Sequence, residues 1–456
     1  MSCELRVNFM VTVSAQRTLR AGLNRQGIDS PQQMASSVGR LIRSVAQLAP
    51  GEALSRLSSV AIVMFLGHSY GVVILGVYAL AVTISQYLQP IIDFGLRHIG
   101  ARLVAQQPHL AGEVVRQVQY RRLRMAGAAL PLIVIYILAV RLPAPMKAFL
   151  LVFSFSSALY AVSLDWAAWG RNQLRLVGFA RAVVPVSILA FLFLGRGNSG
   201  QVLWWVVAGN IFGYLAQAAA FWAWWGKHKP QGPALLEEQR LIGDSVAWRR
   251  SRIMGLAWLG NLAFNSIDML MLGLMSSPQQ VGLYSAAYRI LNQVLVAYYL
   301  FLQGLYPELS RQNVAQRIRM LRPKILLILL GAGAAIAAVL VMARQPLLTL
   351  LFGHQFLAAC PLLLLLAWAI PLDFLTSYLS NAYIAWGMEN SILLCTAIGA
   401  VSNILLNLLW IPRYGAAAAA VNTLLSYLIF LASLALVGRY TKELAREAPA
   451  IPELAR

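Results

Sequence analysis

The chain has 456 residues, of which 59% are hydrophobic and 12% charged, and its mean hydropathy is +0.66. Ordinary soluble domains hold roughly 45 to 50% apolar and about 25% charged residues. This composition excludes a soluble globular protein and predicts a polytopic membrane protein. We assign the net charge of +21 to membrane topology and to contact with anionic headgroups, and we predict no nucleic-acid partner.

About twelve apolar runs are long enough to cross roughly 30 Å of hydrocarbon at about 1.5 Å per residue. They lie near residues 45–67, 72–104, 123–141, 147–168, 177–195, 201–226, 252–275, 281–306, 324–343, 357–384, 390–411 and 415–437. The runs are continuous and lack the alternation of barrel strands, so we predict an all-α protein.

The spanning pattern occurs twice. Gly76-Val77-Tyr78 in the second span is repeated as Gly282-Leu283-Tyr284 in the eighth, 206 positions later. Duplicated bundles are typical of transporters, because two bundles that rock against each other open a central site to either side. We therefore expect two six-helix lobes. The expected parts are a cytoplasmic N-terminal tail (1–44), an N-lobe (45–226), a cytoplasmic linker (227–251), a C-lobe (252–437) and a cytoplasmic C-terminal tail (438–456).

The basic residues predict the orientation. If both termini are cytoplasmic, 28 of the 37 Lys and Arg residues fall in the tails and the inner loops, and five fall in the outer loops. An excess of Lys and Arg on the cytoplasmic side is the usual rule for inner-membrane proteins. We therefore predict a multi-pass protein of a cytoplasmic membrane.

Ionisable side chains at the centre of a span cost about 2.5 to 3.5 kcal/mol, so they need a partner or a hydrated cavity. The seventh span carries Asn261, Asn265 and Asp268 as one polar stripe. Arg289 in the eighth span lies at a depth similar to that of Asp268, and Gln293 follows one turn later. We predict that these residues line a substrate cavity. The alternative is a polar clamp between helices.

Polar positions in two further spans extend this set. Asp373 follows Pro371 at the middle of the tenth span, and Asn403 and Asn407 lie one turn apart in the eleventh. Buried acids in transporters often exchange a proton or a cation. We predict Asp373 and Asp268 as ion-coupling residues.

Glu52 and Arg56 lie one helical turn apart in the first span and are able to form an ion pair. Arg56 lies near the midplane, and it is a second candidate for attracting an anionic substrate. Asp93 and Arg97 have the same spacing at the cytoplasmic end of the second span, where we expect them to pair. We predict a gate or structural role for Glu52, Asp93 and Arg97.

No enzymatic, metal or cofactor chemistry is indicated. The three cysteines are scattered, the five histidines show no ligand spacing, and no glycine-rich segment ends in Gly-Lys-Ser or Gly-Lys-Thr. The outer loops are short, which leaves no room for an extracytoplasmic catalytic domain. We predict a protein that is not an enzyme and uses no cofactor.

Seven short motifs, spread over residues 40–438, resemble one family. They are Tyr70-Gly71, Gly76-Val77-Tyr78-Ala79-Leu80, Asp93-Phe94-Gly95-Leu96, Asn265-Ser266-Ile267-Asp268, Gly282-Leu283-Tyr284-Ser285-Ala286-Ala287-Tyr288, Leu351-Phe352-Gly353 and Ile411-Pro412-Arg413-Tyr414-Gly415-Ala416. In order and spacing they resemble the polysaccharide transporter (Wzx-type flippase) branch of the multidrug/oligosaccharidyl-lipid/polysaccharide exporter superfamily, whose fold is MATE-like.

The resemblance implies translocation of an oligosaccharide linked to undecaprenyl pyrophosphate from the inner to the outer leaflet of a bacterial inner membrane. The product would be an O-antigen, a capsule or an exopolysaccharide. It also implies a cationic central cavity, to which Arg56 and Arg289 contribute beside Asp268. Membrane lipids are expected partners, and the polysaccharide polymerase and chain-length proteins are further candidates.

Three alternatives stay open at this stage. One is a related cation-coupled exporter of drugs or of a peptidoglycan precursor. The second is a membrane polysaccharide polymerase or glycosyltransferase, and the third is a scaffold that transports nothing. Export of a lipid-linked oligosaccharide, driven by H+ or Na+, is the reading that the motifs and the absence of a nucleotide-binding loop favour.

Overall fold

The computed structural model describes residues 31–196, 199–229, 245–310 and 322–447, which form helices and no strand. The chain divides into two compact units, Met1–Pro50 and Gly51–Arg456, and every site discussed below lies in the second. Most of the predicted N-terminal tail, the middle of the predicted linker and the last nine residues lie outside the described residues.

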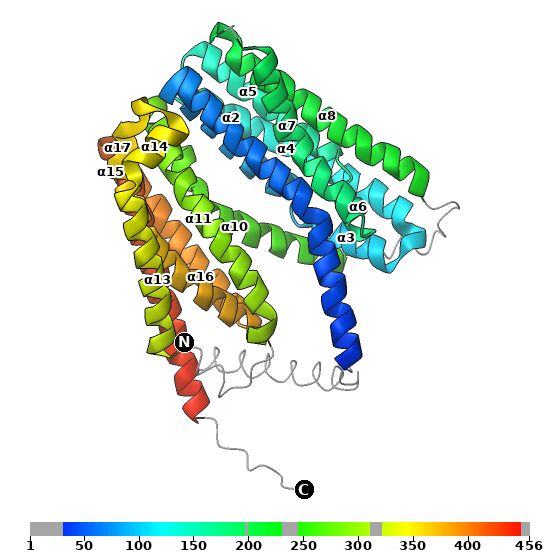
Figure 1. The fold of residues 1–456 in the computed structure, drawn as a ribbon. Coiled ribbons are helices and arrows are strands. Elements are labelled where there is room, and N and C mark those ends of the chain that lie inside the picture. The colour runs from blue at the N-terminus through cyan, green and yellow to red at the C-terminus, as the bar shows by residue number, and fades with distance from the viewer. Residues whose placement is uncertain (1–30, 197–198, 230–244, 311–321, 448–456) are drawn as a thin grey trace. The chain divides into compact units, whose positions relative to one another are not determined.

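The first group of helices corresponds to the predicted N-lobe. It comprises α2 (Pro31–Asp93), α3 (Leu96–Gln106), α4 (Ala111–Ala139), α5 (Ala144–Ala158), α6 (Asp165–Gly170), α7 (Leu174–Leu194) and α8 (Val202–His228), with the 3-10 turns η1 (Pro108–Leu110), η2 (Leu159–Val162) and η3 (Ser199–Gln201). Within it α8 packs on α7 and α5, α4 packs on α5, and α3 packs on α6 (Figure 1).

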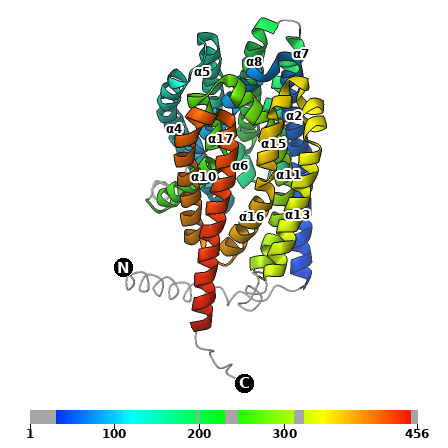
Figure 2. The ribbon, with the colours of Figure 1, turned by 90° about the vertical axis from the view of Figure 1, so that its left-hand side faces the viewer.

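The second group corresponds to the predicted C-lobe. It comprises α10 (Ser245–Met275), α11 (Pro278–Ser310), α13 (Pro323–Met342), α14 (Arg344–Phe352), η4 (His354–Ala359), α15 (Cys360–Ala367), α16 (Ala369–Ala385) and α17 (Glu389–Glu447). Here α17 packs on α10 and α16, and α16 packs on α13 and α11. Figure 2 shows α13, α16 and α17 as neighbours. The prediction of an all-α membrane protein with two lobes is confirmed.

Each of the predicted spans has a helical counterpart. Eight segments of the described residues are long and apolar enough to cross a membrane. Two of these, in α2 and α17, contain two spans each, because Gly71 (φ 83°) and Gly415 (φ 57°) interrupt their helical geometry. The helices α10 and α11, with 31 and 33 residues, supply two more. A positive φ with an extended ψ is open almost only to glycine, which explains a break at Gly71 (ψ −173°).

Large apolar side chains point outward as well as inward. On α4, Leu132, Ile135 and Leu138 recur every three residues and are largely exposed, whereas Phe149 and Trp166 are fully buried between helices. An apolar exterior is expected where lipid, rather than water, surrounds a helix whose backbone bonds are satisfied internally.

The duplicated glycines bring the two groups of helices together. A methyl group added to Gly76 would lie 2.2 Å from the carbonyl oxygen of Pro278, and one added to Gly282 would lie 2.1 Å from the carbonyl oxygen of Val72. Positions 72 and 278 are also 206 apart, as are 76 and 282, so the contact is reciprocal between the two copies of the repeat. Only a residue without a side chain allows the backbones of α2 and α11 to approach this closely.

Further contacts fasten α2 to the second group. The Tyr87 hydroxyl donates to the Leu262 carbonyl oxygen of α10 at 3.2 Å. Near the other end of this interface, the Gln355 amide donates to the Gly67 carbonyl oxygen at 2.7 Å. The helix α2 therefore borders both lobes, which places its polar side chains between them.

Candidate functional site

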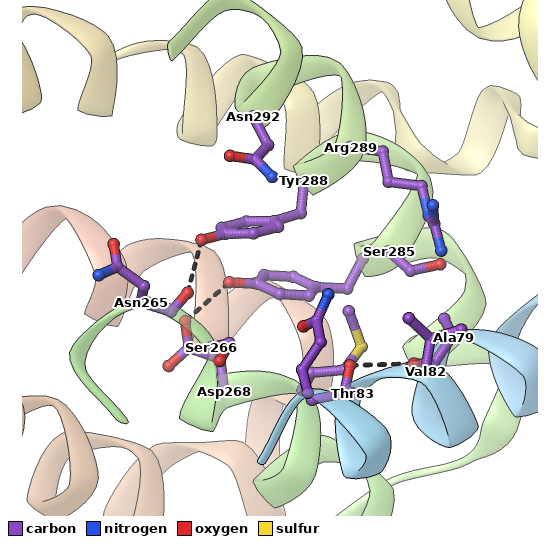
Figure 3. Close-up of a pocket in the computed structure, with 13 residues that line it drawn as sticks. Ala79, Val82, Thr83, Asn265, Ser266, Asp268, Ser285, Tyr288, Arg289 and Asn292 are labelled. Atoms are coloured by element: carbon purple, nitrogen blue, oxygen red, sulfur yellow. Dashed lines mark hydrogen bonds between the residues drawn. The ribbon is translucent and has the colours of Figure 1, made fainter. Parts of the chain in front are cut away.

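Arg289 occupies the middle of α11. It lies eleven residues after Pro278, or about 16 Å along the helix, close to the centre of a hydrocarbon layer of about 30 Å. Its half-buried side chain lines a cavity of about 120 Å³ between α2, α10 and α11. Figure 3 shows this cavity, with Ser285, Tyr288, Arg289 and Asn292 contributed by α11.

Arg289 differs from other arginines of the spans in its partners. Among the residues that the structure describes, it makes no hydrogen bond or ion pair, whereas Arg56 is paired with Glu52 at 3.0 Å. A guanidinium at this depth is costly unless water or an anion satisfies it. Its planar fork of donors matches the oxygens of a phosphate. Arg289 is therefore suited to receive an anionic group.

Asp268 lines the same cavity but is held by neutral donors. It is 2% exposed. One carboxylate oxygen accepts hydrogen bonds from the Tyr284 hydroxyl at 2.8 Å and from the Thr423 hydroxyl at 3.0 Å, and the other accepts one from the Asn407 amide at 2.6 Å. The expected meeting of Asp268 with Arg289 thus takes the form of one shared cavity, and no direct ion pair joins the two within the described residues.

An amide chain extends the Asp268 cluster through α17. The Asn407 amide also donates to the Asn403 carbonyl oxygen at 2.7 Å, and the Asn422 amide donates to that of Asn407 at 2.9 Å. The pairing of Asn403 with Asn407 follows from their spacing, but Asn422 and Thr423 were missed. Their only signal is that polar residues interrupt an alanine-rich span. The cluster offers several side-chain oxygens around one carboxylate, which suits a proton or a small hard cation.

Asp373 lies in a larger neighbouring cavity of about 550 Å³. One of its carboxylate oxygens accepts hydrogen bonds from the Tyr299 and Ser377 hydroxyls, each at 3.2 Å. Asn261 and Asn265 line this cavity too, so the structure brings together much of the predicted polar set. The two cavities share residues of α2, α10 and α11, namely Gln86, Asn265, Ser266, Tyr288 and Asn292.

Two predicted site residues lie apart from this centre. Arg56 lines none of the described cavities; it is half-exposed and is paired with Glu52, which also lies 3.5 Å from Arg181. Gln293 and Arg289 line a small cavity of about 60 Å³ between α2, α11 and α14. Arg289 therefore connects this recess with the main cavity.

The expected pairing of Asp93 with Arg97 is wrong. Asp93 is paired instead with Arg122 of α4 at 2.9 Å, and Arg97 is paired with Asp165 of α6 at 2.9 Å. The reason is a break between α2 and α3, where Phe94 and Gly95 have φ values of 37° and 80°. The rule that residues four apart share a helical face fails across such a break.

Arg122 is the hub of this second network. It is 0% exposed, and it donates to the carbonyl oxygens of Tyr160, at 3.1 Å, and of Ser163. The Tyr160 hydroxyl in turn donates to Asp93 at 2.7 Å. The sequence contained no signal for the burial of Arg122, which lies in a run of basic residues that suggests an exposed loop.

Known proteins resemble the chain in sequence and in fold. Residues 54–313 match the protein family described as "Polysaccharide biosynthesis protein". None of the curated proteins matches in sequence. Among solved structures, the lipid II flippase MurJ in its inward closed conformation is 13% identical with a TM-score of 0.61, and the match covers 86% of this chain and 87% of that one.

Two multidrug-type structures share the same fold. An inward-facing MATE family transporter of the MOP superfamily is 14% identical with a TM-score of 0.58, covering 89% of this chain and 96% of that chain. The Vibrio cholerae MATE transporter VcmN is 15% identical with a TM-score of 0.55, covering 91% and 99%. At these identities the likeness establishes the MATE-like fold.

Proposed function

Since this chain belongs to the polysaccharide biosynthesis protein family, we propose that it is a flippase for a lipid-linked oligosaccharide. The substrate would be carried on undecaprenyl pyrophosphate and moved from the cytoplasmic to the outer leaflet of a bacterial inner membrane. The glycan would serve an O-antigen, a capsule or an exopolysaccharide. Both termini would lie in the cytoplasm, as the distribution of Lys and Arg predicts.

The observation that carries this proposal is the unpaired Arg289 at mid-membrane depth. A pyrophosphate cannot cross hydrocarbon without a hydrated, positively charged path. Arg289 supplies a guanidinium without a carboxylate partner among the described residues, on the wall of a cavity whose other polar groups are amides and hydroxyls. The polyprenyl tail would remain in the lipid while the head group passes along this path.

A buried acid would couple the movement to an ion gradient. Asp268 and Asp373 each lie next to the central cavities and accept hydrogen bonds from neutral side chains. Binding of H+ or Na+ at one of them would neutralise its charge and alter these hydrogen bonds, which would bias one conformation over another.

The test measures the accessibility of lipid-linked oligosaccharide in sealed membrane vesicles, using a sugar-modifying probe confined to one side. Arg289→Ala should reduce flipping about tenfold to hundredfold, because a charged hydrogen bond contributes about 1.5 to 3 kcal/mol. Arg289→Lys should recover part of it. Arg116→Ala is the matched control, since Arg116 is an exposed arginine paired with Glu113 on α4.

Probe access that is the same with and without the protein, at equal substrate levels, would rule out flipping and favour a polymerase or a scaffold. The fold is shared with a structure titled as a lipid II flippase and with multidrug transporters. Lipid II and a cationic drug therefore belong in the same assay. Preferential transport of either would replace the oligosaccharide as the substrate.

A further inference from the structure

We propose that the glycan of the carried lipid binds in a second cavity, within the N-terminal group of helices, through uncharged side chains led by Gln86 and Tyr78. This inference rests on the proposed flippase function and adds to it a place and a chemistry for the sugar. The side chains concerned were not among the residues predicted from the sequence.

The cavity measures about 560 Å³ and is enclosed mainly by α2, α5, α7 and α8. Ligand pockets of proteins usually measure about 300 to 1,000 Å³, so it is large enough for an organic ligand. Its uncharged polar lining is rich in amides and phenols. The main contributors are Tyr78, Gln86, Gln89, Asn210, Tyr214 and Gln217.

The charged groups on its wall neutralise each other. Arg97 is paired with Asp165 at 2.9 Å, and Arg181 lies 3.5 Å from Glu52. A second anion would therefore find no unpaired cation here, in contrast with the cavity of Arg289. What this wall offers is hydrogen-bonding groups without net charge, which is the chemistry that recognises the hydroxyls of a neutral sugar.

Part of the polar lining is already organised by internal bonds. The Asn210 amide donates to Ser157 at 3.1 Å, the Ser85 hydroxyl donates to the same serine at 2.8 Å, and the Gln89 amide donates to the Tyr214 hydroxyl at 3.3 Å. Such bonds would be explained by helix packing alone. They also fix the positions of the remaining lone pairs, so that a ligand would lose little entropy in ordering them.

Gln86 and Tyr78 are not explained by helix packing. Gln86 is exposed to the cavity, and within the described part of the chain neither its amide nor the Tyr78 hydroxyl has a hydrogen-bond partner. An unpaired amide between apolar helices is costly unless it meets water or a ligand. Tyr78 also presents its ring edge-on to Phe153, with the centroids 6.4 Å apart, which holds the phenol in place.

Gln86 lies where the cavities adjoin. It lines the cavity of Arg289, the larger cavity of Asp373 and the N-terminal cavity, and Val82 is shared by the first and the third. A sugar joined directly to a pyrophosphate would pass this point if the phosphate were held at Arg289. The cavities thus fit the two chemically different parts of one head group.

The experiment measures equilibrium binding to the purified full-length protein in lipid nanodiscs. One probe is undecaprenyl pyrophosphate, and the other is the lipid-linked oligosaccharide extracted from a producing strain that lacks this gene. Gln86→Leu and Tyr78→Phe are suitable variants, because each removes a polar group that makes no bond within the described protein. Arg289→Ala serves as the comparison.

The wild type should bind the oligosaccharide lipid more tightly than the bare carrier. Gln86→Leu and Tyr78→Phe should each weaken the oligosaccharide lipid by about twofold to tenfold, the effect of one net hydrogen bond, and leave the bare carrier unchanged. Arg289→Ala should weaken both probes to the same extent.

Equal wild-type affinities for the two probes would overturn the glycan site while leaving the flippase proposal intact. Variants at Gln86 and Tyr78 that weaken both probes equally, or neither, would also overturn it. Failure of the wild type to bind either lipid would refute the flippase proposal itself, and the glycan site with it.

Discussion

At the scale of single residues, the pair of Arg122 and Asp93 is the clearest case of a charge that needs its partner. Both side chains are buried, and their 2.9 Å ion pair is supplemented by hydrogen bonds to backbone carbonyl oxygens and from Tyr160. Removal of one partner of a buried pair leaves an uncompensated charge. Its stabilising effect is therefore best measured by removing the partners separately and together.

Arg122→Met should lower the free energy of unfolding by about 3 to 5 kcal/mol, because Asp93 stays buried without its cation. The double variant Arg122→Met with Asp93→Asn should recover part of that loss. Thermal unfolding of the purified protein in detergent measures both. A double variant as unstable as the sum of the two single variants would show that the pair is not coupled.

Asp268 and Asp373 allow the coupling ion to be located. Asp268→Asn keeps the size of the side chain but removes its charge, so the protein should remain folded while flipping loses its stimulation by an H+ or Na+ gradient. Asp373→Asn is the matched variant in the neighbouring cavity. The acid whose amide variant responds to the gradient as the wild type does is not the coupling residue. Unchanged stimulation in both variants would exclude this pair.

At the scale of helices, the close contact of α2 with α11 depends on two glycines. An alanine methyl at Gly76 would lie 2.2 Å from the backbone oxygen of Pro278, which no side-chain rotation relieves. Gly76→Ala should therefore destabilise the protein by about 1 to 3 kcal/mol, and Gly282→Ala should do the same.

Gly127 of α4 provides the control for this measurement. A methyl group added there has nothing within 4 Å, and the residue is helical. Gly127→Ala should raise stability slightly, by about 0.4 to 1 kcal/mol. A Gly76→Ala variant as stable as Gly127→Ala would mean that α2 and α11 do not meet in the folded protein.

The helices themselves were predictable, because the length of an apolar run and its boundaries are local properties. The polar stripe that ends at Asp268 was also visible from spacing. The partners were harder to predict. Tyr284, Thr423 and Asn422 reach Asp268 from helices distant in the sequence, and Gln86 acquires its position only from the packing of α2 between two groups of helices. The pairing of Asp93 failed because a backbone break turns Arg97 away.

At the scale of the whole molecule, alternating access requires the two groups of helices to separate at one end and then the other. A methyl group added at Gly67 of α2 would lie 3.4 Å from the Cβ atom of Phe352 on α14. Disulfides need a Cβ separation of about 3.5 to 4.5 Å, so a cysteine pair at these positions is close to bonding distance.

Gly67→Cys combined with Phe352→Cys, in a background without the native cysteines, should form a disulfide under mild oxidation. The bond should stop flipping in vesicles, and a reducing agent should restore it. Each single variant under the same oxidation is the control. Full activity of the oxidised, cross-linked protein would show that the halves do not part at this end.

The reciprocal contact of Gly76 and Gly282 has a consequence for the origin of the chain. A contact in which a position meets the copy of itself is the kind found at the two-fold axis of a homodimer. Each half thus carries a self-complementary patch, with the glycine of one copy seated against the backbone of the other. A half-length ancestor with this patch would have been able to pair with itself before the two copies were joined, and neither glycine was then free to gain a side chain.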